Sequence, residues 1–150
     1  DRNRNFITSL FLKTEVMEQK NIDLQAKYKT ISENEVRFEE INTDDADYIL
    51  VAYGISARIC MKIMELARKE GIKLGLFRPI TLWPFPTERI KQLSSKTKGM
   101  MSVELSSGQM VEDVRLSVNG KIPVEFYGRM GGSVYSPVEV LDYFKSDLHK

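Results

Sequence analysis

Cysteine, histidine and long apolar runs are scarce in this chain of 150 residues. The single cysteine, Cys60, cannot form an internal disulfide, which fits a reducing compartment and predicts a cytoplasmic protein. It cannot hold an iron–sulfur cluster either, because such clusters take about four thiolates. The single histidine, His149, is the second residue from the end, so neither a zinc site nor a Ser–His–Asp triad is expected.

An excess of charge of one sign is also missing. The chain has 22 Lys and Arg against 21 Asp and Glu, a balance that argues against a nucleic-acid binder. No apolar run approaches the roughly 20 residues that cross a bilayer, so no membrane partner is expected. The chain starts at Asp1 without a methionine, which predicts a piece of a longer protein. Hydrophobic residues make up 42%, enough for a folded core.

Short apolar runs alternate with amphipathic stretches from Tyr48 onward, as in a parallel sheet covered by helices on both faces. Ser56 is a candidate N-cap, Gly71 a candidate helix end, and Ser136 with Glu139 a capping box. The predicted strands are residues 48–53, 73–77, 100–105 and 123–127, and the predicted helices are residues 57–70, 86–95, 109–118 and 137–148.

The N-terminal part differs from this alternation. Residues 14–31 predict a helix with its apolar side chains along one side, and residues 36–41 predict a short edge strand. The apolar stretch at residues 6–12 is expected to pack on this domain or on a partner. We therefore predict a linker and helix over residues 1–34 and an α/β domain over residues 35–150.

Two corners between a strand and a helix are candidate binding sites. Gly54 and Ser56 mark the first, where free backbone N–H groups can hold an anion, although the dinucleotide and P-loop glycine patterns are absent. Glu104, followed by Gly108 and Gln109, marks the second, at the strand edge where open α/β sheets bind ligands. The alternative is structural in both cases: a capped turn at the first corner, and a carboxylate without a catalytic partner at the second.

Two loops carry further candidates. Residues 78–86 hold Arg78, Trp83 and Phe85 among three prolines, and this stiff loop predicts either an interface anchor or a cap over the domain's own core. Residues 128–132 place Arg129 among three glycines, where it would bind a carboxylate or phosphate, or else remain solvated.

Four strings together resemble one family, the α subunits of 2-oxoacid:ferredoxin oxidoreductases, in their C-terminal part. They are DYILVAYG at 47–54, GLFRPITLWPFP at 75–86, VELSSGQMVEDV at 103–114 and GRMGG at 128–132. The likeness extends more loosely over residues 6–28, which look like the linker of the ketoisovalerate type. It implies a transketolase C-terminal-like fold: three layers, with a five-stranded mixed, mostly parallel sheet in the order 1-3-2-4-5 and strand 1 antiparallel. The loops after Gly54 and Glu104 would then face one crevice.

The resemblance also implies a host enzyme that decarboxylates a 2-oxoacid with thiamine diphosphate and Mg²⁺, and passes electrons through iron–sulfur clusters to ferredoxin. The acyl group goes to coenzyme A, and the implied partners are a thiamine-binding β subunit, an iron–sulfur subunit and a γ subunit. This chain lacks the G-D-G…N-N thiamine diphosphate motif, so no catalytic, cofactor or metal residue carries over. Assembly and docking remain as its expected role. The alternatives are the C-terminal domain of a transketolase or a 2-oxoacid dehydrogenase, and a small-molecule binding module.

Overall fold

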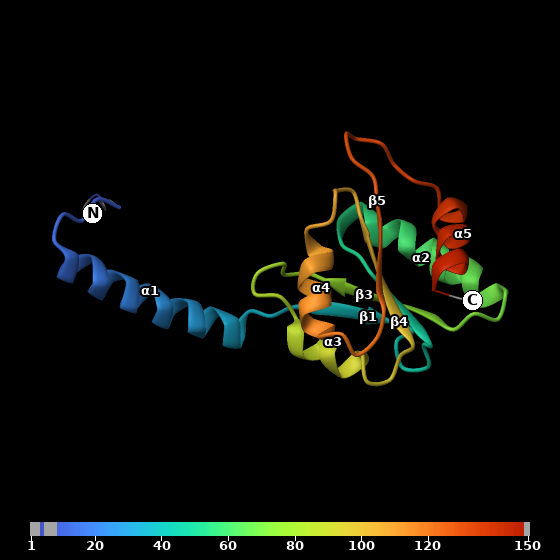
Figure 1. The fold of residues 1–150 in the computed structure, drawn as a ribbon, viewed down its shortest axis with the longest axis horizontal. Helices are drawn as coiled ribbons and strands as arrows, with labels where there is room; N and C mark the ends of the chain where they lie inside the picture. The colour runs from blue at the N-terminus through green and yellow to red at the C-terminus, as the bar shows by residue number, and fades with distance from the viewer. Residues whose placement is uncertain (1–3, 5–8, 149–150) are drawn as a thin grey trace. The chain divides into compact units, whose positions relative to one another are not determined.

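The computed structural model describes residue 4 and residues 9–148, which fall into two compact units on either side of the Glu35–Val36 bond (Figure 1). The first unit contains the helix α1 (Thr14–Asn34), which buries none of its residues. Its end lies three residues beyond the predicted one. Residues 6–8 of the apolar stretch and His149 lie outside the described residues.

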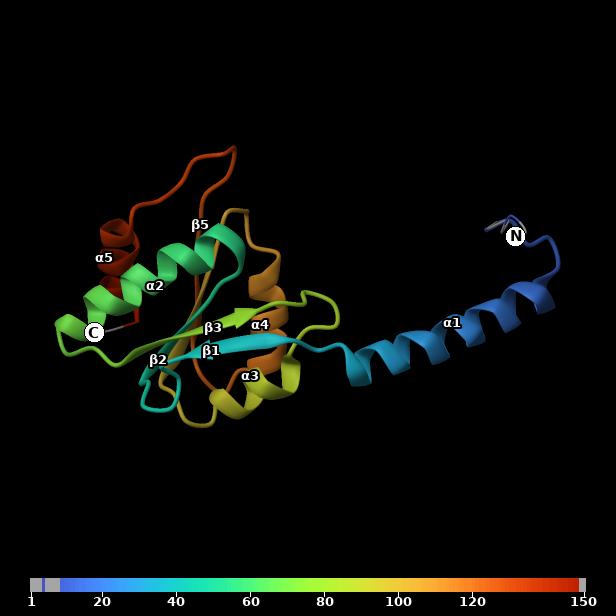
Figure 2. The ribbon, with the colours of Figure 1, turned by 180° about the vertical axis from the view of Figure 1, so that it is seen from behind.

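The second unit is built on one sheet of five strands. The strands are β1 (Phe38–Ile41), β2 (Tyr48–Val51), β3 (Leu74–Pro79), β4 (Gly99–Glu104) and β5 (Val124–Gly128). Their order is β1-β3-β2-β4-β5, with β1 antiparallel to β3 and all other pairs parallel (Figure 2). The predicted fold class and strand order are confirmed.

Helices cover both faces of this sheet, as its apolar strands require. The helices are α2 (Gly54–Lys69), α3 (Thr87–Leu93), α4 (Met110–Val118) and α5 (Pro137–Asp147). α2 and α5 pack around Leu50 and Leu76 on one face, and α3 and α4 pack around Val51 and Phe77 on the other (Figures 1 and 2). β2, β3, β4 and β5 therefore supply apolar side chains to both cores, whereas β1 supplies Ile41 to the core beside α2.

Two of the predicted helix boundaries are confirmed by their hydrogen bonds. Gly71 follows α2 with a φ of 82°, and the N–H groups of Gly71 and Ile72 donate to Arg68 and Ala67, which is a Schellman ending. The capping box between Ser136 and Glu139 starts α5 with Pro137 at the first helical position.

The strand β3 differs from its prediction, because it continues through Arg78 and Pro79 instead of ending at Phe77. The antiparallel neighbour β1 explains the extension, since Glu39 pairs with Arg78 and Phe38 with Pro79. Two predicted strands are shorter in the structure: β2 ends at residue 51 instead of 53, and β1 starts at residue 38 instead of 36.

Cys60 lies in the core between α2 and the sheet with none of its surface exposed, and burial raises the pKa of its thiol. A thiol in such a place acts as a small apolar side chain. Cys60→Ala is expected to lower the free energy of unfolding by about 1–2 kcal/mol, because it leaves a small cavity. Chemical denaturation measures the change. Rapid reaction of the native protein with a thiol reagent would contradict this placement.

Glu40 connects the edge strand β1 to α3. Arg89 donates to both carboxylate oxygens at 2.5 and 3.0 Å, and the Thr43 hydroxyl donates at 2.6 Å. The hydrogen bond from Arg89 holds the pKa of Glu40 below its usual range. The stabilisation is therefore present above the unfolded-state pKa and is lost as the pH falls through the folded-state pKa.

Glu40→Gln is thus expected to lower the free energy of unfolding by about 1 kcal/mol at pH 7, with a difference from the unmodified protein that shrinks in acid. Urea unfolding at several pH values measures it. Glu88→Gln is the control, because Glu88 is a largely exposed α3 residue whose contact with Lys91 spans 3.7 Å. A pH-independent loss in Glu40→Gln would contradict the ion pair's role.

Candidate functional site

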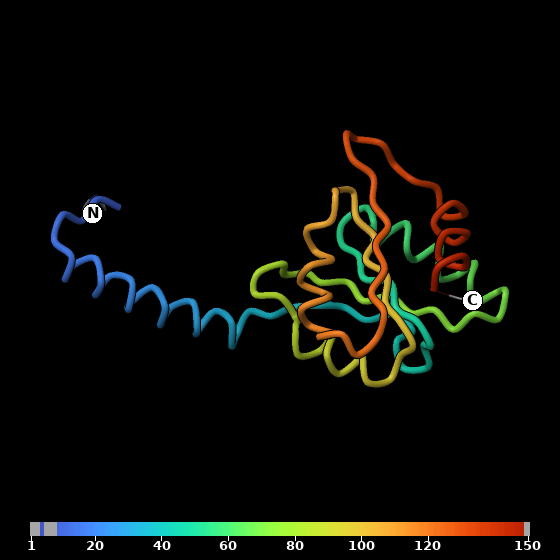
Figure 3. Tube along the Cα trace, in the orientation of Figure 1, coloured from blue at the N-terminus to red at the C-terminus, as the bar shows by residue number. Residues whose placement is uncertain are grey.

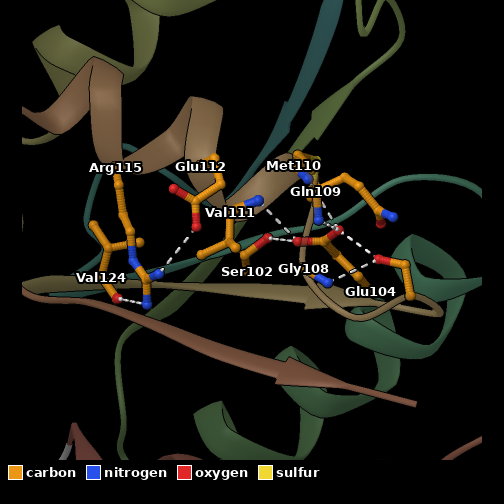
Figure 4. A network of polar contacts seen from close by, with 10 residues as sticks. Ser102, Glu104, Gly108, Gln109, Met110, Val111, Glu112, Arg115 and Val124 are labelled. Carbon is orange, nitrogen blue, oxygen red and sulfur yellow. Dashed lines mark hydrogen bonds and ion pairs between the residues drawn. The ribbon is translucent and has the colours of Figure 1, made fainter. Parts of the chain in front are cut away.

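Glu104, the last residue of β4, is buried with 1% of its surface exposed (Figure 4). Its carboxylate accepts hydrogen bonds from the backbone N–H groups of Gln109, Met110 and Val111 at 3.2, 3.1 and 2.9 Å. The hydroxyls of Ser102 and Ser106 donate to it at 2.9 and 2.8 Å. The free N–H groups at the start of α4 are therefore satisfied from within the chain.

Glu104 therefore acts as an N-cap side chain for α4, although it belongs to the preceding strand, β4. The positive end of the α4 dipole and the N–H groups hold an anion here, and that anion is the chain's own carboxylate. Gly108 permits the turn, with a φ of 102° and little room for a side chain beside Val111 and Phe126. Burial, with the nearby charges of Glu104 and Glu112, raises the pKa of Asp113. Of the two alternatives for Glu104, the geometry matches the structural one.

The candidate arginines also have partners within the chain. Arg78 binds Glu39 at 2.6 Å across the β1–β3 pair. Arg129 binds Glu139, which also accepts a hydrogen bond from the hydroxyl of Tyr127. Hydrogen bonds from Tyr127 and Arg129 hold the pKa of Glu139 below its usual range. Arg129 therefore forms an ion pair with α5 of its own chain.

Ser56 is not the N-cap of α2, so that prediction is wrong. The helix begins two residues earlier, at Gly54, whose φ is 57°, and Tyr53 takes the cap position without a side-chain bond. Ser56 is buried instead, and its hydroxyl oxygen accepts a hydrogen bond from the hydroxyl of Tyr135 at 2.6 Å. Burial raises the pKa of Tyr135 to about 12. Ser56 thus joins α2 to the segment before α5.

The two aromatic residues of the β3–α3 loop have different surroundings. Trp83 is 59% exposed, and the peptide bond that joins it to Pro84 is cis. Phe85 is half-buried and packs against the core beneath α3 and α4. Thr81 holds the loop by donating to the carbonyl of Pro84 at 2.9 Å. Phe85 therefore caps the core, whereas most of the Trp83 surface faces solvent.

Exposed apolar side chains gather at the edge of the sheet where the carboxyl ends of the parallel strands lie. Apart from Phe38, Met61 and Leu116, every exposed large apolar side chain in residues 36–148 lies between the end of a parallel strand and the first turn of the next helix. These side chains are Tyr53, Ile55, Ile80, Leu82, Trp83, Leu105, Met130, Val134 and Val138. We call this surface the carboxyl-end edge. Figure 3 traces one of its loops, the β5–α5 connection, projecting from the rest of the unit.

The opposite edge of the sheet is polar. Among the residues that the structure describes, the connections β1–β2, α2–β3, α3–β4 and α4–β5 expose no large apolar side chain. Exposed apolar patches on one side of a domain mark contacts with other proteins. The exposed apolar surface of this unit is therefore concentrated at the carboxyl-end edge.

A groove of about 520 Å³ is lined by Gly54 and Arg78, together with residues of α2, β1 and β3. Ser56, Glu104, Gly108 and Gln109 do not line it. This groove therefore contains Gly54 and Arg78 and does not include the Glu104 corner. Sequence reasoning missed Arg58, which also lines the groove, because its position over β1 depends on the strand order.

A family model, pyruvate:ferredoxin oxidoreductase core domain II, matches residues 46–140 of this chain. The chain belongs to the pyruvate:ferredoxin oxidoreductase core domain II family. The matched residues begin just before β2 and end within α5, so the match covers β2 to β5, the helices α2, α3 and α4, and the first turn of α5.

Individual relatives of this core domain II chain are longer proteins. It is 49% identical over 139 residues to the ketoisovalerate oxidoreductase subunit VorB of Methanothermobacter thermautotrophicus, covering 93% of this chain and 39% of that protein. It is 33% identical to the 2-oxoglutarate synthase subunit KorA of Methanothermobacter marburgensis, over 67% of this chain and 27% of that subunit. The chain thus spans well under half the length of these relatives.

Solved structures show the same fold for this core domain II. A 2-oxoglutarate:ferredoxin oxidoreductase from Magnetococcus marinus, solved with 2-oxoglutarate, coenzyme A and succinyl-CoA bound, superposes with a TM-score of 0.76 at 18% identity. The match covers 92% of this chain and 24% of that one. A split-gene transketolase, in an inactive β4 tetramer, gives a TM-score of 0.63 at 17% identity, over 75% of this chain and 41% of that one.

The described side chains of core domain II do not fit an iron–sulfur cluster or a metal site of three or more side-chain ligands. The one thiol is buried and cannot supply the set of cysteines that an iron–sulfur cluster takes. The described residues contain no group of three or more His, Cys, Asp or Glu side chains placed to hold a metal ion. No described helix is long and apolar enough to cross a membrane. We assign no catalytic step to this chain.

Proposed function

We propose that this chain is the assembly domain of the α-type subunit of a 2-oxoacid:ferredoxin oxidoreductase whose substrate is 2-ketoisovalerate. The observation that carries the proposal is the 49% identity to the VorB subunit over 93% of the chain. The reaction is the oxidative decarboxylation of the 2-oxoacid to an acyl-CoA. In this proposal, residues 1–34 are the linker and helix that precede the domain, and residues 35–150 form the domain itself.

The internal pairing of the candidate site residues supports a non-catalytic role. Glu104, Arg78 and Arg129 each bind a partner within the chain, so none offers a free charge to a substrate. The carboxyl-end edge supports docking, since its apolar side chains are exposed without contributing to either core. In the parent enzyme, that edge would be covered by another domain or subunit.

The cofactors and partners follow from the same proposal. Thiamine diphosphate, Mg²⁺, coenzyme A and iron–sulfur clusters would be bound elsewhere in the parent enzyme. The partners would be the thiamine-binding β subunit, the iron–sulfur subunit and the γ subunit, with ferredoxin as electron acceptor. The location would be the cytoplasm.

Co-expression tests this proposal. The complete subunit that contains this sequence is produced with the other subunits, and the reduction of ferredoxin is followed with thiamine diphosphate and coenzyme A present. We expect faster turnover with 2-oxoisovalerate than with pyruvate or 2-oxoglutarate, and no turnover by the 150-residue chain alone. Turnover by the isolated chain would overturn the assembly role, and a preference for another acid would overturn the substrate.

A further inference from the structure

The groove beside α2 joins apolar surface to an unpaired charge. Its lining comes from β1 (Glu39 and Ile41), β3 (Leu76 and Arg78) and the start of α2 (Gly54, Ile55, Ala57, Arg58 and Met61). It arises because α2 packs with α5 over the middle of the sheet, while β1 lies beyond them at the sheet's edge.

The floor of the groove is apolar. Ile41 and Leu76 are register partners on β1 and β3, and both side chains belong to the α2 side of the sheet. Ile55 and Met61 form a rim that is 59% and 49% exposed. Leu76 is fully buried already, so the apolar surface that another chain would remove from water belongs to Ile41, Ile55 and Met61.

The charges in the groove are unequal. Arg78 is balanced by Glu39 at 2.6 Å, whereas the guanidinium of Arg58 makes no hydrogen bond or ion pair with any residue that the structure describes. Arg58 is the fifth residue of α2, close to the positive end of the helix dipole, where a cation does not stabilise the helix. The fold itself therefore gives no reason for a positive charge at this position.

We propose that this groove binds a segment of another protein chain of the parent oxidoreductase, in which an Asp or Glu lies among apolar side chains. The inference rests on the proposed function and identifies the docking site within it. The segment's carboxylate meets Arg58, and its apolar side chains cover Ile41, Ile55 and Met61. The groove is continuous with the carboxyl-end edge, because Ile55 belongs to both surfaces.

Charge reversal tests the electrostatic part of this docking. In the complete subunit, Arg58→Glu is expected to weaken the affinity for the remaining subunits at least tenfold, and the loss should shrink at high salt. Lys121→Glu, the same charge change in the polar α4–β5 connection, is the control and should alter the affinity less than threefold. Thermal unfolding of both variants checks folding, since neither side chain makes a hydrogen bond or ion pair with the residues that the structure describes.

Photo-crosslinking identifies what lies in the groove. A photoreactive amino acid replaces Ile55 at the rim or, as a control, Leu116, which is 75% exposed near the end of α4. In the assembled enzyme, we expect the Ile55 position to link to a partner-chain peptide that contains Asp or Glu among apolar residues, and the Leu116 position not to link to it. A link from the Ile55 position to a second copy or to residues 1–35 of the same chain would overturn the proposal.

The two proposals fail in different ways. If the unmodified subunit does not assemble with the other subunits, the proposed function is wrong and the docking site is wrong with it. If the unmodified subunit assembles and Arg58→Glu assembles equally well, only the docking site is wrong.

Discussion

Replacing Glu104 with glutamine is expected to lower the free energy of unfolding of this domain by about 3 kcal/mol or more. The carboxylate accepts three backbone N–H groups and two hydroxyls in a buried place. Hydrogen bonds to a charged group contribute about 1.5–3 kcal/mol each, and an orphaned buried donor costs about 1–3 kcal/mol. Glutamine keeps the shape but removes the charge and presents an NH₂ group to donors. Urea unfolding at pH 7 measures the loss.

Glu112→Gln is the matched control for Glu104→Gln. Glu112 lies in the first turn of the same helix, 72% exposed, and its contact with Arg115 spans 3.4 Å. Surface substitutions of this kind change stability by about 0.5 kcal/mol or less. Equal, small effects of the two changes would show that Glu104 does not hold the start of α4.

Replacing Trp83 with alanine is expected to weaken the association of the complete subunit with its partners by about 2 kcal/mol or more, which is roughly 30-fold in Kd. Trp83 is exposed in a loop held by Thr81, Pro84 and the half-buried Phe85, so it presents a large apolar surface from a fixed backbone. Tryptophan is prominent among the residues that dominate binding at protein interfaces. Titration of the variant subunit against its partners measures the change.

Leu116→Ala is the control for Trp83→Ala, because Leu116 is exposed near the opposite edge and should leave association unchanged. The melting temperature of the isolated chain should be nearly the same for Trp83→Ala as for the unmodified chain. A large fall in that temperature without any effect on association would make Trp83 a second core cap, like Phe85.

The fold was predictable because its signals are local. The apolar run at residues 48–53 marks a strand covered on both faces, Gly71 marks a helix end, and the capping box at Ser136 marks a helix start. Each signal depends on residues within a few positions of one another, so no tertiary information is needed. The strand order, by contrast, came from the resemblance, because alternation alone does not say which strands are neighbours.

The roles of the candidate site residues were harder to predict because their partners are distant in sequence. Ser56 has the residue type of an N-cap, yet it meets Tyr135, 79 positions away. Arg78 belongs to β3 because it is the strand register partner of Glu39, which lies 39 positions earlier in the sequence. The sequence predicts the correct edge of the sheet for Glu104. It does not reveal that the Glu104 carboxylate accepts hydrogen bonds from the backbone N–H groups at the start of α4.

Hydrogen–deuterium exchange of the complete subunit, alone and in the assembled oxidoreductase, tests the docking account most directly. We predict that assembly slows exchange at the carboxyl-end edge, in residues 53–58, 80–83 and 105–107 and along the β5–α5 connection. Exchange in the polar connections at residues 42–47, 95–98 and 119–123 should stay unchanged. Protection confined to those polar connections, with the carboxyl-end edge exchanging as fast in the complex as in the free subunit, would contradict the account.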